Sequence, residues 1–189
     1  MIPVMDLGNH SPTARVSWTS TSTSITLSSD APLLAGDVVM NNYGAKSNES
    51  LLMSYGFCLK ENEMDVFGVE FRLGGGAILG PFYVARKDGS GEQFPTELWR
   101  ALDDPGNFVE GEGGEGPVEV DLDSAEMLLA ALTRKLGPFQ VTAAYDEEMM
   151  EGDEADMRPA FVAMYRCGQR RVLEEAVETL EEMLEAAEG

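Results

Sequence analysis

The sequence predicts an α+β protein in which a β-rich N-terminal part is followed by an all-α helical part. Before residue 73, short runs alternate between apolar and polar residues, which is typical of half-buried strands. After residue 78, apolar residues recur at intervals of three and four, which is typical of amphipathic helices. The 189 residues are 43% hydrophobic, which is enough for a packed core. We therefore expect two domains, residues 1–73 and residues 78–189.

Strands and one short helix are expected in the first part. Alternating runs at residues 14–18, 24–27 and 37–42, separated by polar turns, predict three strands. Residues 66–73 alternate again and predict a fourth strand. Residues 1–5 are apolar, and we expect them to be buried.

Residues 43–57 are the stretch around which the first part is organised. Tyr43 follows the expected third strand, and Gly44 allows a sharp turn. Ser47 is a good helix N-cap and Gly56 a good helix end, so a short helix is expected between them. About two helical turns then bring Tyr55 back beside Tyr43. Two tyrosines at element ends suggest a site, although buried tyrosines with hydrogen-bonded hydroxyls are the simpler interpretation of this stretch alone.

Helices are expected after an extended segment at residues 82–84. Pro95 suits the first turn of a helix that carries Leu98, Trp99 and Leu102. Residues 103–116 are rich in glycine and acidic residues and predict a surface loop.

Two longer helices follow this loop. Asp123 and Glu126 have the spacing of a capping box, and we expect that helix to end at residues 137–138, a Gly-Pro pair. Residues 147–156 predict an acidic loop. Pro159 suits the start of a long final helix. That helix has a glutamate-rich side, which is most simply a solvated surface and alternatively a docking site for a basic peptide: Glu174, Glu175, Glu178, Glu181, Glu182 and Glu185.

The charge balance narrows the classes of partner. Thirteen Lys and Arg residues face 34 Asp and Glu residues, which gives a net charge of −21. Such a chain repels phosphate backbones, so direct nucleic-acid binding is not expected. An acidic surface favours encounters with basic protein segments, and it also serves solubility.

The few cysteines and histidines argue against a metal site. Cys58 and Cys167 form neither a metal-binding pattern nor a disulfide framework, and His10 is the only histidine. No apolar run reaches the length of a membrane span, and no membrane association is expected. Reduced thiols fit an intracellular protein, with cytoplasm, nucleus and plastid all left open.

A second motif precedes Tyr43 and is interpreted together with residues 43–57. Residues 6–12 read Asp-Leu-Gly-Asn-His-Ser-Pro. The pair of segments resembles the C-terminal half of the SET domain of the Rubisco large-subunit methyltransferase type. That family has an Asp-x-x-Asn-His-Ser segment and a later Tyr-Gly-x-x-Ser-Asn-x-x-Leu-x-x-x-Tyr-Gly-Phe segment. Residues 94–102 and 168–173 resemble the helical substrate-binding domain that follows SET in the same family.

The resemblance implies an activity, a cofactor and roles for five residues. It implies methyl transfer from S-adenosylmethionine to a lysine side chain of a protein substrate. Tyr43 matches the catalytic tyrosine, near the transferring methyl group. Asn9 and His10 match cofactor contacts, and His10 also braces a pseudoknot. Tyr55 matches a residue that lines the site, and Phe57 one that packs near the adenine. Tyr55 also favours a lysine over a histidine acceptor.

Nothing in the sequence matches the first half of the SET domain. We therefore expect a truncated chain, and the two alternatives are completion by a partner chain and loss of catalysis. A truncated chain would lack part of the cofactor pocket. The alternative function is a non-catalytic, acidic protein-interaction module that retains a SET remnant.

Overall fold

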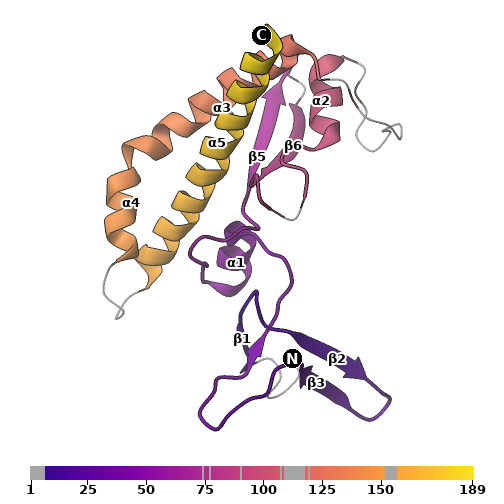
Figure 1. Cartoon of the computed structure of the whole chain (residues 1–189), viewed down its shortest axis with the longest axis vertical. Coiled ribbons are helices and arrows are strands. Elements are labelled where there is room, and N and C mark those ends of the chain that lie inside the picture. Colours follow the sequence, from indigo (N-terminus) through magenta and orange to yellow (C-terminus); the bar gives the residue numbers. More distant parts are fainter. Residues whose placement is uncertain are drawn as a thin grey trace. The chain divides into compact units, whose positions relative to one another are not determined.

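Figure 1 shows a computed structural model of the chain, which describes residues 7–73, 75–76, 78–89, 91–106, 108, 118, 120–151 and 157–189. Small sheets and several helices make up these residues, as expected of the predicted α+β class. The chain groups into two compact units, Met1–Lys46 and Ser47–Gly189. This division into compact units does not test the domain boundary predicted between residues 73 and 78, which therefore stays a prediction.

The first unit contains two pairs of short strands. Strand β1 (Asn9–His10) pairs in parallel with β4 (Met40–Asn41). Strands β2 (Val16–Ser20) and β3 (Ile25–Ser29) form an antiparallel hairpin. Its turn is closed by Thr21, whose backbone N–H donates to the Ser24 carbonyl at 2.8 Å and whose side-chain oxygen accepts the Ser24 N–H at 3.0 Å. Both predicted strands of the hairpin are therefore confirmed, each shifted by one or two residues.

One expectation for the first unit changes, and another falls outside the described residues. The strand predicted at residues 37–42 is reduced to β4, because the Asp37 carboxylate accepts the Leu34 N–H at 2.7 Å and Gly36 has a φ of 101°, so residues 34–37 form a turn. Asn9 and His10 form β1, in which Asn9 is exposed and His10 is half-buried. Residues 1–5, expected to be buried, lie outside the described residues.

The second unit begins with a helix whose two ends follow the sequence closely. Helix α1 (Asn48–Tyr55) is capped by Ser47, whose side chain accepts the Ser50 N–H at 3.3 Å. Gly56 ends it in the left-handed conformation with a φ of 77°, and its N–H donates to the Leu51 and Leu52 carbonyls, each at 3.1 Å. Both predicted helix ends are therefore confirmed. Each end residue satisfies backbone groups that would have no partner within the helix.

A hairpin and four helices complete the second unit. Strands β5 (Val66–Arg72) and β6 (Ile78–Ala85) pair antiparallel with a bulge between Val69 and Phe71. Helices α2 (Thr96–Asp103), α3 (Leu122–Val141), α4 (Ala143–Met150) and α5 (Arg158–Glu188) follow. In Figure 1, α5 (yellow) runs alongside α3 and α4 (orange), and the three are in contact. The core joins one face of the hairpin to three of the helices, with these among its fully or nearly buried members: Val69, Val84, Leu98, Trp99, Leu128, Leu132, Val172, Leu173 and Leu180.

Helix α3 differs from its prediction at both ends. Its cap is Asp121, whose carboxylate accepts the Ser124 N–H at 2.9 Å, so the predicted capping box at Asp123 and Glu126 is wrong. The helix also continues through Pro138 to Val141. Proline removes one helical hydrogen bond. The next residue, Phe139, nevertheless packs against the core, with its ring edge-on to that of Phe67 and the ring centroids 6.3 Å apart. Packing therefore outweighs the local signal.

The acidic residues after α3 are also more ordered than predicted. Residues 147–150 belong to α4, while 152–156 lie outside the described residues. Residues 107 and 109–116 of the loop expected at 103–116 lie outside them too. On α5, Glu175 is not simply solvated, because it accepts the Arg86 Nε–H at 2.8 Å on each carboxylate oxygen. Glu174, Glu178, Glu181 and Glu185 are exposed on the same helix, and exposed Glu182 pairs with Lys87 at 3.0 Å.

Candidate functional site

The strand bridge of the first unit brings the two predicted motifs together. Asn9 lies opposite Met40, and His10 lies opposite Asn41. Gly8 allows this approach, because a Cβ there would lie 3.3 Å from the Asn41 Cβ. The chain then places Tyr43 two residues beyond β4. Residues that are far apart in the sequence therefore share one local structure.

The His10 and Tyr43 side chains form the centre of this cluster. Their rings stack, with centroids 5.0 Å apart and planes 19° apart. The Tyr43 backbone N–H donates to His10 Nδ1 at 3.1 Å, so the neutral imidazole carries its hydrogen on Nε2. The Tyr43 hydroxyl donates to the Gly8 carbonyl at 2.8 Å. The two motifs are thus joined through both a side-chain and a backbone group of Tyr43.

The environment of His10 favours the neutral imidazole. Burial lowers its pKa, and the nearby Lys46 charge lowers it further, while a hydrogen bond to the Asn41 backbone acts in the opposite direction. A neutral imidazole that accepts a backbone hydrogen at Nδ1 keeps a donor at Nε2. The His10 imidazole is therefore an uncharged hydrogen-bonding group that is held in one orientation.

The Tyr43 hydroxyl has a defined chemical capacity. Its hydrogen is committed to the Gly8 carbonyl, and the phenolic oxygen retains lone pairs. Such an oxygen can accept a hydrogen bond or contact a partial positive charge.

Asn42 was not predicted to have a role and organises the turn around Tyr43. Its side-chain amide donates to the carbonyls of Pro12 and Ala14 at 3.2 and 3.3 Å. Its side-chain oxygen accepts the Gly44 N–H at 2.8 Å. The sequence carried a signal for it, because two consecutive asparagines are unusual in a strand.

Tyr55 and Phe57 form the second group of predicted site residues, in the second unit. They lie on either side of Gly56, where the left-handed turn ends α1. Their ring centroids are 6.3 Å apart at a tilt of 52°. Tyr55 is 48% exposed and Phe57 is half-buried, so both rings can receive a flat apolar ligand surface.

A buried polar pair near this aromatic group was also not predicted. Asn48 and Asp65 are each 1% exposed. The Asp65 carboxylate accepts the Asn48 backbone N–H at 2.6 Å and its side-chain amide at 3.0 Å. Burial raises the pKa of Asp65 to about 6, and the hydrogen bonds from Asn48 oppose that rise. Asn48 stood within the recognised motif, but Asp65 lies further along the chain and in no motif.

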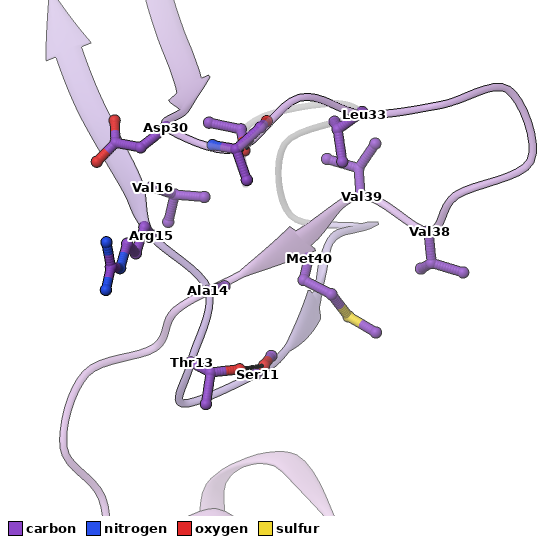
Figure 2. A pocket seen from close by; sticks show the side chains of 12 residues that line it. Ser11, Thr13, Ala14, Arg15, Val16, Asp30, Leu33, Val38, Val39 and Met40 are labelled. Atoms are coloured by element: carbon purple, nitrogen blue, oxygen red, sulfur yellow. Dashed lines mark hydrogen bonds between the residues drawn. The ribbon is translucent and has the colours of Figure 1, made fainter.

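The first unit also has a cavity of about 460 Å³. In Figure 2, the labelled side chains of Leu33 and Val39 are drawn on one side of the pocket, and those of Val16, Arg15 and Asp30 on the other. Its lining contains none of Asn9, His10 and Tyr43. The cavity is therefore not the predicted site, although Ser11 of the first motif contributes to it.

Among the described residues, no group of three His, Cys, Asp or Glu side chains could hold a metal ion. Within the same residues, no helix is both long enough and apolar enough to cross a membrane. Cys58 and Cys167 are free thiols, and burial raises the pKa of Cys58 to about 11.

Comparisons with known proteins found similar sequences among lysine methyltransferases. No family model matches the chain. Ribosomal lysine N-methyltransferase set10 of Schizosaccharomyces pombe is 41% identical over 68 residues, which are 34% of this chain and 12% of that protein. Ribosomal lysine N-methyltransferase 1 of Saccharomyces cerevisiae is 32% identical over 73 residues, 39% of this chain and 12% of that protein.

Solved structures match over nearly the whole chain. The SET domain of LSMT bound to lysine and AdoHcy aligns with a TM-score of 0.63 and 19% identity, covering 96% of this chain and 49% of that one. Rubisco LSMT bound to sinefungin and monomethyllysine aligns with a TM-score of 0.55 and 18% identity over the same shares. The chain thus spans about half the length of these structures. The predicted resemblance is confirmed at the level of the fold by these structures, and in sequence by ribosomal lysine N-methyltransferases over about a third of the chain.

Proposed function

We propose that this chain takes part in methyl transfer from S-adenosylmethionine to a lysine side chain of a protein. The stacked pair of His10 and Tyr43 carries the proposal, because it joins the two motifs in one hydrogen-bonded cluster. The names of the matched proteins support it, since they describe lysine methyltransferases and a structure bound to AdoHcy and lysine. The ribosomal relatives further support a ribosomal protein as substrate.

The chemistry of the predicted site residues suits the methyl donor. Asn9 and His10 offer amide and imidazole groups for the polar amino-acid portion of the donor. Tyr55 and Phe57 offer two partly exposed rings, which suit the adenine. We assign Tyr43 the position next to the transferred carbon. When bound, S-adenosylmethionine supplies an activated methyl group on a sulfonium.

Tyr43 would contribute by position rather than by proton removal. The substrate amine must be neutral, because an ammonium has no lone pair for attack. The bound donor would supply the methyl carbon and keep the electron pair of the broken sulfur–carbon bond as a thioether, which would leave a methylammonium on the lysine. The Tyr43 oxygen, oriented by its hydrogen bond to Gly8, would face the polarised carbon and hold it in line. His10 would keep the Tyr43 backbone in place.

The charge of the chain favours a basic substrate. A net charge of −21 raises the encounter rate with positively charged segments, and ribosomal proteins are rich in lysine and arginine. This attraction weakens as salt screens it. Methylation of a ribosomal substrate should therefore slow between about 50 and about 300 mM salt, chiefly through association.

The test has a binding arm and a transfer arm. Calorimetric titration of the chain with S-adenosylmethionine should show saturable binding. Labelled methyl groups should then appear on lysine residues of a ribosomal protein fraction. Tyr43→Phe should lower transfer at least about ten-fold with AdoHcy binding retained, because only the oxygen is lost. Tyr145→Phe is the matched control, since Tyr145 is 61% exposed on α4.

Two results would count against this function. Undiminished transfer by Tyr43→Phe would remove the role assigned to that residue. Failure of the folded chain to bind S-adenosylmethionine would favour the second candidate, a non-catalytic acidic interaction module. The glutamates of α5 favour that candidate, and it predicts binding of a basic protein without any methyl donor.

A further inference from the structure

We propose that Asn48 and Asp65 are positioning residues that clamp the Tyr55–Phe57 segment and couple it to helix α5. The placement of Tyr55 and Phe57 at the cofactor rests on the proposed function, whereas the clamp itself is argued from contacts within the second unit. None of the predicted site residues belongs to the clamp. Its members are instead buried, and they act through the backbone that carries the two rings.

Asn48 holds the segment by contacting both backbone groups of one residue. Its side-chain oxygen accepts the Leu59 N–H at 2.8 Å, and its side-chain amide donates to the Leu59 carbonyl at 2.9 Å. Leu59 lies two residues beyond Phe57. The other end of the segment is fixed by the Gly56 cap on α1. Residues 56–59 are thus pinned at both ends, with Phe57 inside the pinned part and Tyr55 directly before it.

Asp65 fixes the orientation of the Asn48 amide. It accepts the Asn48 side-chain amide at 3.0 Å, which leaves the amide oxygen facing Leu59. Its second oxygen accepts the Asn48 backbone N–H at 2.6 Å, at the start of α1. Both contacts need an acceptor on each oxygen of Asp65. A neutral amide at this position could supply only one.

Helix α5 closes over this pair at a glycine. A Cβ on Gly168 would lie 2.1 Å from Asp65 Oδ2, so only glycine allows this approach. The neighbouring Gln169, 4% exposed, donates to the Val66 carbonyl at 2.9 Å. The long helix therefore holds Asp65 by close packing and the following residue by a hydrogen bond. Movement of α5 at this point would be transmitted to Asn48 and to Leu59.

A carboxylate that serves only the fold would behave differently from a clamp. If Asp65 were only a costly buried carboxylate, replacing it with the uncharged isostere asparagine would leave the protein equally or more stable. In the clamp, the same change places one amide donor against another donor of Asn48, whichever way the new side chain is turned. The Leu59 contacts should then loosen. Asp65→Asn therefore separates the two roles.

The experiment measures amide hydrogen exchange and S-adenosylmethionine affinity in the full chain. In Asp65→Asn, the Leu59 amide should exchange at least ten-fold faster, with amides of α3 unchanged. Asn48→Ala should have the same effect, because Leu59 loses its acceptor. The Kd for S-adenosylmethionine should rise at least five-fold in both variants.

Asp146→Asn is the matched control. Asp146 is also a buried carboxylate, 4% exposed, but it accepts from Thr142 and pairs with Arg166. This variant should speed exchange in α4 and leave both Leu59 and the S-adenosylmethionine affinity unchanged. This control makes the same change from carboxylate to amide and includes any general loss of stability, but it leaves the contacts among Asn48, Asp65 and Leu59 intact.

Each outcome decides a separate claim. Unchanged or slower exchange at Leu59 in Asp65→Asn overturns the clamp. Faster exchange with an unaltered Kd overturns its positioning role. If the unmodified chain binds no S-adenosylmethionine, the proposed function fails for this chain, and the exchange measurements still decide whether the clamp exists.

Discussion

The two units of the chain are stabilised in different ways. Among the described residues of the first unit, only Asn41 is buried, at 9% exposure, and it is polar. Apolar side chains there are largely exposed, with Leu34 at 76% and Val38 at 61%. The second unit has a continuous core in which Leu128, Leu132 and Leu180 are fully buried, alongside others. One unit is held by hydrogen bonds and the other by packing.

The predicted catalytic residue and the buried apolar core therefore lie in different units. The predicted catalytic tyrosine lies in the unit whose described residues form no buried apolar core, and groups of two motifs fix its position there. Such contacts are directional, but each adds only about 1 kcal/mol. The packed unit can tolerate little change in shape, whereas the first unit should tolerate changes on its apolar surface. Substitutions in each unit can test this contrast.

The largest effect is expected where the packed unit has no spare space. Gly168→Ala would drive a methyl group into Asp65, so we expect a loss of about 4–5 kcal/mol in unfolding free energy. Gly137→Ala is the control, because nothing lies within 4 Å of a Cβ at that helical position. It should stabilise by up to about 1 kcal/mol. Denaturant unfolding measures both, and similar values for the two would contradict the close approach.

A core truncation sharpens the contrast between the units directly. Leu132→Ala should cost about 3–4 kcal/mol, because Leu132 is fully buried. Leu34→Ala in the first unit should cost less than about 0.5 kcal/mol, since its side chain is 76% exposed. Thermal unfolding of both variants tests this. A large cost for Leu34→Ala would show that the apolar surface of the first unit is covered in solution.

The pH dependence of stability tests the buried carboxylate. The pKa of Asp65 in the folded chain is about 6 against an ordinary value of 3.8, chiefly because of burial, while Asn48, Arg86 and Arg171 oppose the rise. Between those values the folded chain binds a proton that the unfolded chain lacks. This group therefore favours folding more at pH 4 than at pH 7, by up to about 3 kcal/mol.

The measurement compares unfolding free energies of the unmodified chain and Asp65→Asn from pH 4 to pH 7. Other carboxyl groups titrate in both proteins and cancel in the difference. The unfolding free energy of the unmodified chain, relative to that of Asp65→Asn, should fall as the pH rises through 6. A difference that does not vary with pH would mean that Asp65 titrates normally.

The smallest effect is expected at the start of the packed unit. Ser47→Ala removes the side-chain acceptor for the Ser50 N–H and should cost about 1 kcal/mol. Ser47→Asp keeps an acceptor and should restore most of that stability. Urea unfolding resolves this difference. An equal loss in both variants would show that the cap contributes nothing.

Local signals in the sequence predicted those features that depend on neighbouring residues. The ends of α1 follow from Ser47 and Gly56, because a hydroxyl acceptor and a left-handed glycine satisfy the unpaired backbone groups. The β2–β3 hairpin follows from alternation around a polar turn. The motifs that contain Asn9, His10 and Tyr43 were recognisable, and so was their resemblance to a known family. The roles of these residues stay predictions.

Contacts between distant residues decided the rest. Helix α3 passes Pro138 because Phe139 packs against Phe67, which local rules cannot include. Asp65 lies in no motif, and its role follows from Asn48 and from Gly168 on α5. The sequence by itself determined the fold class, the short helix and the motif pair, because these depend on residues close in the chain. Only tertiary structure placed His10 against Tyr43 and α5 against Asp65, because such pairings depend on which surfaces meet.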